Sequence, residues 1–107
     1  MEVTIVMPIF NAERFLDESI SSLLSQTCRN WNLICVDDGS TDKSKAIVEA
    51  YCRKDARIKL ISQTNAGPAV ARARAIELVD TEYVAILDSD DAYVPDYIEK
   101  MLQRAKE

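Results

Sequence analysis

Four short, largely apolar runs alternate along this sequence with four longer segments in which apolar residues recur at helical spacing. The apolar runs cover residues 3–7, 31–36, 58–61 and 83–87. Runs of this length without polar alternation are typical of strands that are covered on both faces. Parallel strands need a crossover connection, which a helix usually provides. We therefore predict an α/β fold: an open, mainly parallel sheet with helices on both faces, in the order β-α-β-α-β-α-β-α.

The boundaries of the expected elements are marked by particular residues. The first strand should end before Pro8, because proline cannot donate to a continuing ladder. Asn11 offers a side-chain cap for a first helix that runs through Gln26 and turns Phe15 towards the sheet. Pro68 occupies a first helical position and opens an alanine-rich third helix. The last helix is expected to start at Pro95.

Three carboxylates follow the fourth apolar run within four residues, at Asp88, Asp90 and Asp91. Two unit charges about 4 Å apart repel by roughly 1 kcal/mol in water and by about 4 kcal/mol at a partly buried site. A bound cation would relieve this repulsion, so the cluster points to a metal. A solvated acidic loop that caps the following helix is the alternative interpretation.

Two further features follow the other strands. The Pro8–Asn11 turn comes after the first strand, and Asp37-Asp38 comes after the second. The carboxyl ends of parallel strands lie at one edge of a sheet, and open α/β folds bind their ligands there. We therefore expect this turn and all five carboxylates in one neighbourhood. For Asp38, bracing its own turn is an equally good interpretation.

Composition narrows the choice of function. The chain has 107 residues, of which 48% are hydrophobic, and this fits one domain over residues 1–107. A formal net charge of −5 argues against a nucleic-acid partner. With only two glycines, the chain lacks both the dinucleotide-binding fingerprint and the phosphate loop. It also has no histidine, so a bound metal would be held by oxygen, which favours Mg²⁺ or Mn²⁺.

The three cysteines carry no recognisable site. Cys28, Cys35 and Cys52 lack the spacing of a zinc site or of a disulfide framework, and Cys35 is expected to pack within its strand. The sequence also shows no basic leader and no apolar stretch of the roughly 20 residues that span a bilayer. These observations predict a cytoplasmic protein.

Four motifs, in this order, closely resemble the amino-terminal half of the family 2 glycosyltransferases. They are Val3–Asn11, Asp37–Asp42, Asn65–Gly67 with Ala71-Arg72, and Asp88–Asp91. The resemblance covers essentially the whole chain. It implies a GT-A fold and an inverting enzyme that transfers a sugar from a nucleotide sugar, as in the synthesis of bacterial polysaccharides.

The resemblance also implies roles for individual residues. Pro8 and Phe10 would line the nucleoside pocket, and Asp37 would accept a hydrogen bond from the uracil ring of UDP. Asp88 would face the ribose, and Asp90 would bind a Mn²⁺ or Mg²⁺ ion that bridges the two phosphates. The expected set is completed by the nucleotide contacts Asn11, Asp38, Asn65, Gly67, Arg72 and Ser89, and by Asp88 and Asp91 as further metal ligands.

The chain departs from the family pattern at two residues and in its length. Ala73 and Ala75 stand where the family usually has Asn and Gly. Members of the family run considerably further, and the additional half carries the acceptor site and the general base. The resemblance therefore implies that this chain holds no catalytic base and alone transfers no sugar. For the full enzyme it implies a saccharide or lipid-linked acceptor and peripheral association with a membrane.

Two alternative functions stay open from the sequence. One is a non-catalytic module that binds a nucleotide sugar or a partner. The other is a receiver-like Mg²⁺-binding domain, which would carry an acid pair where this chain has Pro8.

Association between copies of the chain is a further expectation. In the GT-A fold, the half that is absent here supplies the outer neighbour of the fourth strand. An unprotected strand edge is a template for pairing with another chain. We therefore predict a homodimer around the fourth strand, with Ile98, Met101 and Leu102 of the last helix in part of its buried surface.

Overall fold

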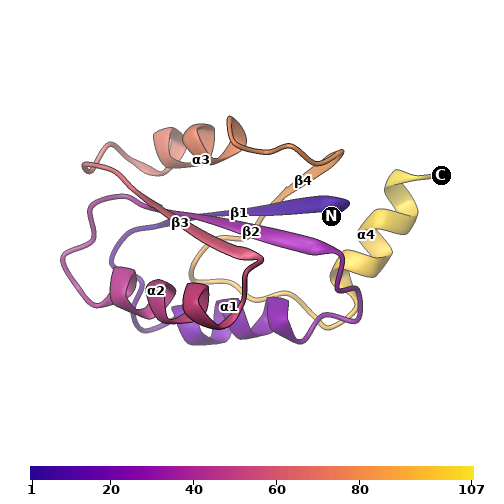
Figure 1. The fold of residues 1–107 in the computed structure, drawn as a ribbon, viewed down its shortest axis with the longest axis horizontal. Helices are drawn as coiled ribbons and strands as arrows, with labels where there is room; N and C mark the ends of the chain where they lie inside the picture. Colours follow the sequence, from indigo (N-terminus) through magenta and orange to yellow (C-terminus); the bar gives the residue numbers. More distant parts are fainter.

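The computed structural model describes residues 1–107 and contains one four-stranded sheet with four helices (Figure 1). All neighbouring strands pair in parallel, in the order β3-β2-β1-β4. The predicted α/β fold, with its alternating strands and helices, is thereby confirmed. The elements are β1 (Val3–Ile9), α1 (Leu16–Leu24), β2 (Trp31–Asp37), α2 (Ser44–Lys54), β3 (Ile58–Ser62), α3 (Pro68–Ile76), β4 (Tyr83–Ile86) and α4 (Tyr97–Ala105).

Helices lie on both faces of the sheet. Figure 1 shows α1 and α2 below the strands and α3 above them, with α4 beside the end where the strands begin. The larger core has 16 buried residues and joins the sheet to α1, α2 and α4. On the opposite face, Ala71 and Ala75 of α3 pack against Val6, Ile34 and Val36. Small alanine side chains allow α3 to lie close to the strands.

Pro8 lies inside β1, so the prediction that the strand ends before it is wrong. Alternate residues of a strand direct their backbone groups to opposite sides. The C=O of Ile9 points to the β2 side, where it accepts from the N–H of Asp38. The C=O of Val6 points to the β4 side, where it accepts from the N–H of Leu87. The nitrogen of Pro8 therefore faces the β4 side, beyond the last paired residues, Val6 and Ile86. No ladder bond is lost, because no partner strand continues there.

The fourth strand lies at the edge of the sheet, and only one of its faces is covered. The prediction that both of its faces are covered is therefore wrong. Tyr83, Ala85 and Leu87 pack into the larger core, but Val84 and Ile86 on the other face are each 47% exposed. Helix α3, the one helix on that face, packs on β1 and β2 and does not reach across β4. An unbroken apolar run therefore coexists here with a half-exposed strand.

Two predicted roles at the helices are corrected by the structure. Asn11 does not cap α1, which begins only after Phe15 and has no side-chain cap. In α4, Ile98 and Leu102 are buried in the chain's own core, so they are not available to a dimer interface.

The cysteines are free thiols, and burial raises the pKa of Cys35, which packs within β2 as expected. None of the helices has the length and apolar character that crossing a bilayer would require.

Candidate functional site

Three loops meet at the carboxyl edge of the sheet and are hydrogen-bonded into one rim. The β1–α1 loop is joined to the β2–α2 loop through Asn11, whose N–H donates to the Ser40 Oγ at 3.0 Å. The Asn11 side-chain oxygen accepts from the N–H of Thr41 at 2.8 Å. Asn11 has a φ of +48°, a conformation that asparagine adopts more readily than most residues. Its side chain therefore holds two loops together.

Asp38 joins the β2–α2 loop to the loop before α3. Its Oδ1 accepts from the Gln63 side chain at 2.9 Å and from the Ala66 N–H at 2.7 Å. Its Oδ2 accepts from the Asn65 side chain at 3.2 Å and from the Gly67 N–H at 3.0 Å. The hydrogen bond from Gln63, followed by those from Ala66 and Gly67, lowers the pKa of Asp38 despite its burial. These bonds brace the loop before α3 and not the turn of Asp38 itself, and a contact of Asp38 with a nucleotide stays a prediction.

Gly39 allows these two loops to come so close. Its φ is +76°, and a Cβ placed on it would lie 2.9 Å from the backbone nitrogen of Asn65. A residue with a side chain would therefore meet both backbone strain and a steric clash. The Asn65 side chain completes the junction by donating to the Asp38 C=O at 3.0 Å.

A cavity of about 600 Å³ opens on this rim and is lined by twelve residues. Eight of them belong to the predicted set: Pro8, Phe10, Asn11, Asp38, Arg72, Asp88, Ser89 and Asp90. They come from the ends of β1, β2 and β4 and from α3, so the topology gathers residues that are up to 82 positions apart (8 to 90). Their contact with a nucleotide stays a prediction.

Four lining residues were not predicted: Ile9, Ala12, Phe15 and Pro68. Phe15 was expected to face the sheet, yet it is 46% exposed and lines the same cavity as Phe10, which is 50% exposed. Its place one residue before the first turn of α1 is the reason, because there it lies outside the helical periodicity. Pro68 lines the cavity because it opens α3, a position that the sequence did indicate.

Four members of the predicted set do not line the cavity: Asp37, Asn65, Gly67 and Asp91. Asn65 and Gly67 are engaged with Asp38. The N–H of Asp91 donates to the C=O of Asp88 at 3.0 Å and closes a turn. Asp91 therefore shapes the loop through its backbone.

Asp37 is buried, with 3% of its surface exposed, and its two oxygens differ. The Oδ2 accepts from the Ser40 N–H at 3.3 Å, whereas the Oδ1 is buried without any hydrogen-bond partner. A buried acceptor without a donor costs roughly 1–3 kcal/mol. Asp37 pairs in register with Ile9, which lines the cavity. An unsatisfied carboxylate oxygen thus lies next to the rim.

The charged side chains of the cavity are not neutralised by one another. The three salt bridges of the structure involve Asp55, Asp96 and Glu2, all outside the cavity. Asp88 and Asp90 are exposed on one side, and the half-buried Arg72 approaches from α3. The cavity can therefore offer a cation to an anionic ligand and two carboxylates to a metal.

No three acidic, cysteine or histidine side chains come together as a metal-binding group. The expected set of Asp88, Asp90 and Asp91 is thus not a three-ligand site. Two carboxylates at the cavity nevertheless fit a hard cation of which most ligands are phosphate and water oxygens, as is usual for Mg²⁺. Asp88 and Asp90 are the residues that could hold such an ion.

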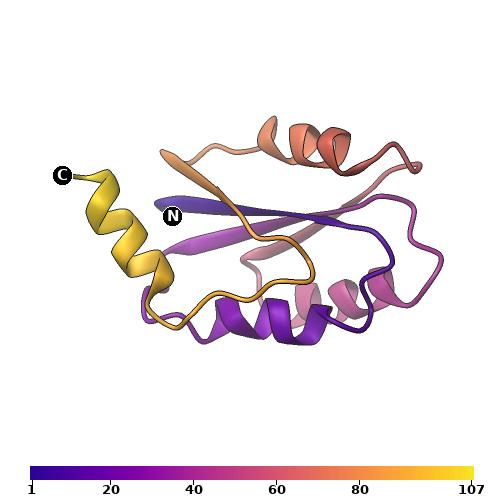
Figure 2. The ribbon, with the colours of Figure 1, turned by 180° about the vertical axis from the view of Figure 1, so that it is seen from behind.

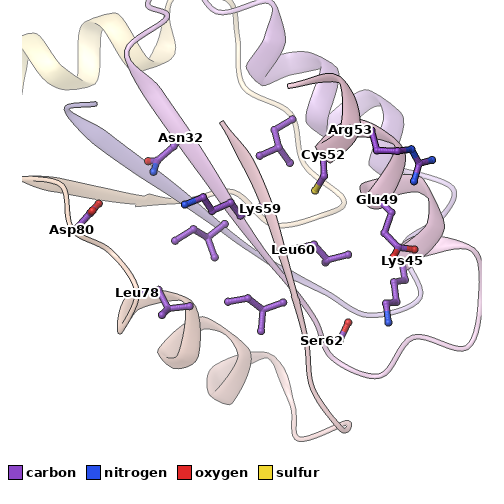
Figure 3. Close-up of a pocket in the computed structure, with 13 residues that line it drawn as sticks. Asn32, Lys45, Glu49, Cys52, Arg53, Lys59, Leu60, Ser62, Leu78 and Asp80 are labelled. Carbon is purple, nitrogen blue, oxygen red and sulfur yellow. The ribbon is translucent and has the colours of Figure 1, made fainter. Parts of the chain in front are cut away.

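A larger hollow, of about 770 Å³, lies along the open edge of β3 (Figure 3). Figure 3 shows Lys45, Glu49 and Arg53 on one side of the strand and Leu78 and Asp80 on the other. None of the predicted site residues lines it. It is the groove left by an unpaired strand between α2 and α3, so we assign the functional site to the smaller cavity, where the loops converge.

The chain belongs to glycosyltransferase family 2, whose family model matches residues 4–107. An uncharacterised glycosyltransferase of Haemophilus influenzae is 46% identical over 101 residues, which are 94% of this chain and 40% of that protein. The chain therefore spans well under half the length of this relative. The resemblance of the four motifs to this family is confirmed.

Solved structures show the same GT-A fold. Residues 1–349 of TarS from S. aureus, in complex with UDP, superpose with a TM-score of 0.92 at 29% identity, over 99% of this chain and 32% of that one. The same protein has also been solved with UDP-GlcNAc. A mannosyltransferase from Pyrobaculum calidifontis, in complex with GDP-Man and Mn²⁺, matches with a TM-score of 0.79 at 25% identity, over 86% of this chain and 28% of that one.

Proposed function

We propose that this glycosyltransferase domain binds the UDP moiety of a nucleotide sugar in the cavity at the carboxyl edge of the sheet. The observation that carries the proposal is the gathering of Phe10, Arg72, Asp88 and Asp90 around one cavity. Beside this cavity, the buried Oδ1 of Asp37 has no hydrogen-bond partner. The uracil ring carries an N3–H donor that would satisfy this oxygen. The UDP complex of TarS supports the choice of nucleotide.

The aromatic side chains provide a surface for the base. Phe10 and Phe15 are both about half exposed and line the cavity. Stacking of a base on an aromatic ring contributes roughly 1–3 kcal/mol and tolerates any base, because each has a π-face. Stacking would therefore supply affinity, and Asp37 would supply the preference for uracil.

The phosphates would be bound by the charged residues of the cavity. Arg72 offers a guanidinium to a diphosphate, and Asp88 and Asp90 would hold Mn²⁺ or Mg²⁺ against it. When bound, such an ion neutralises the charge that develops on the leaving diphosphate. The Mn²⁺ in the mannosyltransferase complex supports this assignment.

The reaction would be the transfer of the sugar, with inversion, to a saccharide or lipid-linked acceptor in polysaccharide or glycoconjugate synthesis. The relatives' additional length supports an acceptor site and a catalytic base outside residues 1–107. Location in the cytoplasm, at the inner face of the membrane, is part of this proposal. There the enzyme would meet nucleotide sugars and a lipid-linked acceptor.

Isothermal titration calorimetry with UDP and CDP, both in Mn²⁺, tests the role of Asp37. Cytosine presents an acceptor at N3, so CDP would leave the Oδ1 facing a lone pair. UDP should bind about 5–150-fold more tightly than CDP, which corresponds to roughly 1–3 kcal/mol. Asp37→Asn should remove most of this preference, whereas Asp80→Asn, at the groove beside β3, should keep it. Equal affinity of the unmodified chain for UDP and CDP would refute the assignment.

A further inference from the structure

The segment between β4 and α4 carries the acidic residues and runs along α1. Figure 2 shows it leaving the end of β4 and following α1 to the start of α4. At its first end Leu87 is 2% exposed, and its N–H donates to the Val6 C=O at 3.1 Å. The next residues, Asp88 to Ala92, form an arch in which only Ser89 is partly buried, and the one hydrogen bond within it is the turn from Asp91 to Asp88. The Asp88 C=O also accepts a long hydrogen bond, of 3.5 Å, from the Ser19 Oγ of α1.

Tyr93 closes the arch at its second end. Its hydroxyl donates to the C=O of Ile86 at 2.7 Å, so the two ends of the arch are joined directly. Its backbone N–H donates to the Ser22 Oγ of α1 at 3.1 Å. The Tyr93 ring stacks on Tyr97, with 4.2 Å between the ring centroids. Burial, together with the neighbouring Tyr97 and Asp88, raises the pKa of Tyr93, so its hydroxyl remains a donor at physiological pH.

Gln26 fixes the segment further along. This residue is 4% exposed, and its side-chain nitrogen donates to the C=O of Val94 at 2.7 Å and to that of Ser22 at 3.0 Å. Its side-chain oxygen accepts from the N–H of Ile98, in the first turn of α4, at 2.9 Å. A buried amide that uses both its donor and its acceptor on the backbone cannot be replaced by Leu or Glu without loss of contacts.

The carboxylates of Asp88 and Asp90 have no partner of their own, as the salt bridges of the chain all lie elsewhere. Their position is therefore decided by the backbone of the arch, by its contact with Ser19 and by the residues that hold its ends. We propose that Tyr93, Ser22 and Gln26 are positioning residues, a clamp that places Asp88 and Asp90 for the metal and diphosphate. This inference rests on the proposed function, because it concerns metal-linked binding at the same cavity.

Tyr93→Phe removes only the hydroxyl that reaches Ile86, and Tyr97→Phe is its matched control. Tyr97 belongs to the same stacked pair, is 41% exposed, and its hydroxyl makes no hydrogen bond within the chain. Gln26→Leu has a similar control in Gln103→Leu on the exposed side of α4. Each variant is titrated with UDP in Mn²⁺ and in excess chelator, and the ratio of the two affinities is the quantity compared.

Tyr93→Phe should lower this ratio by about three- to tenfold, and Gln26→Leu by about tenfold or more, because a loose arch must be ordered when the metal binds. Affinity in chelator should be equal in all four variants, because the base-binding side of the cavity is untouched. A ratio in Tyr93→Phe equal to that of Tyr97→Phe would overturn the clamp. So would an equal loss of affinity in Mn²⁺ and in chelator, which would indicate general damage to the fold.

Amide exchange in the ligand-free protein separates this inference from the proposed function. The amides of Leu87 and Asp91 should exchange several-fold faster in Tyr93→Phe than in Tyr97→Phe, whether or not UDP binds. If the unmodified chain binds no UDP in either condition, the proposed function fails, and the exchange rates alone decide whether the arch is held by this clamp. Unchanged rates would then overturn it.

Discussion

The Oδ2 of Asp38 and the backbone N–H of Gly67 are joined by a hydrogen bond of 3.0 Å that ties the end of β2 to the start of α3. Helix α3 carries Pro68 and Arg72 to the cavity, so this bond and its three companions determine where these two residues lie. Asp38 therefore contributes to the site through the loops it connects, in addition to lining the cavity.

Asp38→Asn should destabilise the chain and change its dependence on pH. The folded pKa of Asp38 lies below its ordinary value of 3.8, so its carboxylate stabilises the fold fully above about pH 5. That contribution is lost as the pH falls through 3.8 towards the folded pKa. An amide in its place would turn an NH₂ group towards backbone donors, at a cost of about 2 kcal/mol at pH 7. Urea unfolding at pH 7 and pH 3 should show a smaller loss between these two pH values in the variant than in the unmodified chain.

Gly39→Ala should cost more stability than Gly67→Ala. Both glycines have positive φ values, +76° and +99°, so both substitutions introduce backbone strain of about 1 kcal/mol or more. Only at Gly39 would the new Cβ also clash with the backbone of Asn65, because nothing lies within 4 Å of it at Gly67. Urea midpoints for the two variants measure the difference. A larger loss at Gly67 would contradict the close approach of the two loops.

Asp90→Ala should make UDP binding independent of the metal. If Asp90 is the principal protein ligand, the variant will bind UDP with the same affinity in Mn²⁺ and in excess chelator, whereas the unmodified chain will bind more tightly in Mn²⁺. Asp91→Ala is the matched control, because Asp91 lies outside the cavity lining. Calorimetry decides the question, and a preserved Mn²⁺ effect in Asp90→Ala would exclude Asp90 from this role.

The chain alone should release UDP from UDP-GlcNAc no faster when saccharide acceptors are added. General-base catalysis contributes about 10²–10⁴-fold to such a reaction, and we expect the base to lie in the additional length of the relatives. Slow hydrolysis by water is compatible with this expectation. UDP release is measured by liquid chromatography, and an acceptor-dependent rate would show that a residue of this chain acts as the base.

The open edge of β4 should form a homodimer. The backbone of Val84 faces outward without a partner, and the side chains of Val84 and Ile86 are half exposed. Part of the edge is capped internally, since the C=O of Ile86 accepts from Tyr93. A specific interface buries on the order of 1,000 Å² or more. Light scattering should show a dimer that Val84→Lys dissociates and Leu78→Lys, at an exposed site in the turn after α3, does not. A monomer at high concentration would contradict the prediction.

Much of the fold could be predicted from local patterns. Strands and helices can be recognised within about ten residues, because apolar residues recur with the period of the secondary structure whose buried face they form. The parallel sheet then follows, and so does the gathering of Pro8, Asp38 and Asp88 at one edge. The wrong predictions concern residues whose pairing or exposure depends on the neighbouring segments of the fold. Pro8 is tolerated inside β1 because β4 has already ended, and Val84 is exposed because α3 does not reach it.

The sequence by itself determined the class of fold, the family and the positions of the acidic residues. The tertiary structure decided which hydrogen bonds Asp37 and Asp38 make. Asp38 is saturated by donors 25 to 29 residues away, whereas its neighbour Asp37 keeps one buried oxygen free. The same holds for Gln26 and Tyr93, whose partners lie on other elements. Hydrogen-bond donors that arrive from distant segments leave no local pattern, so these assignments required the folded chain.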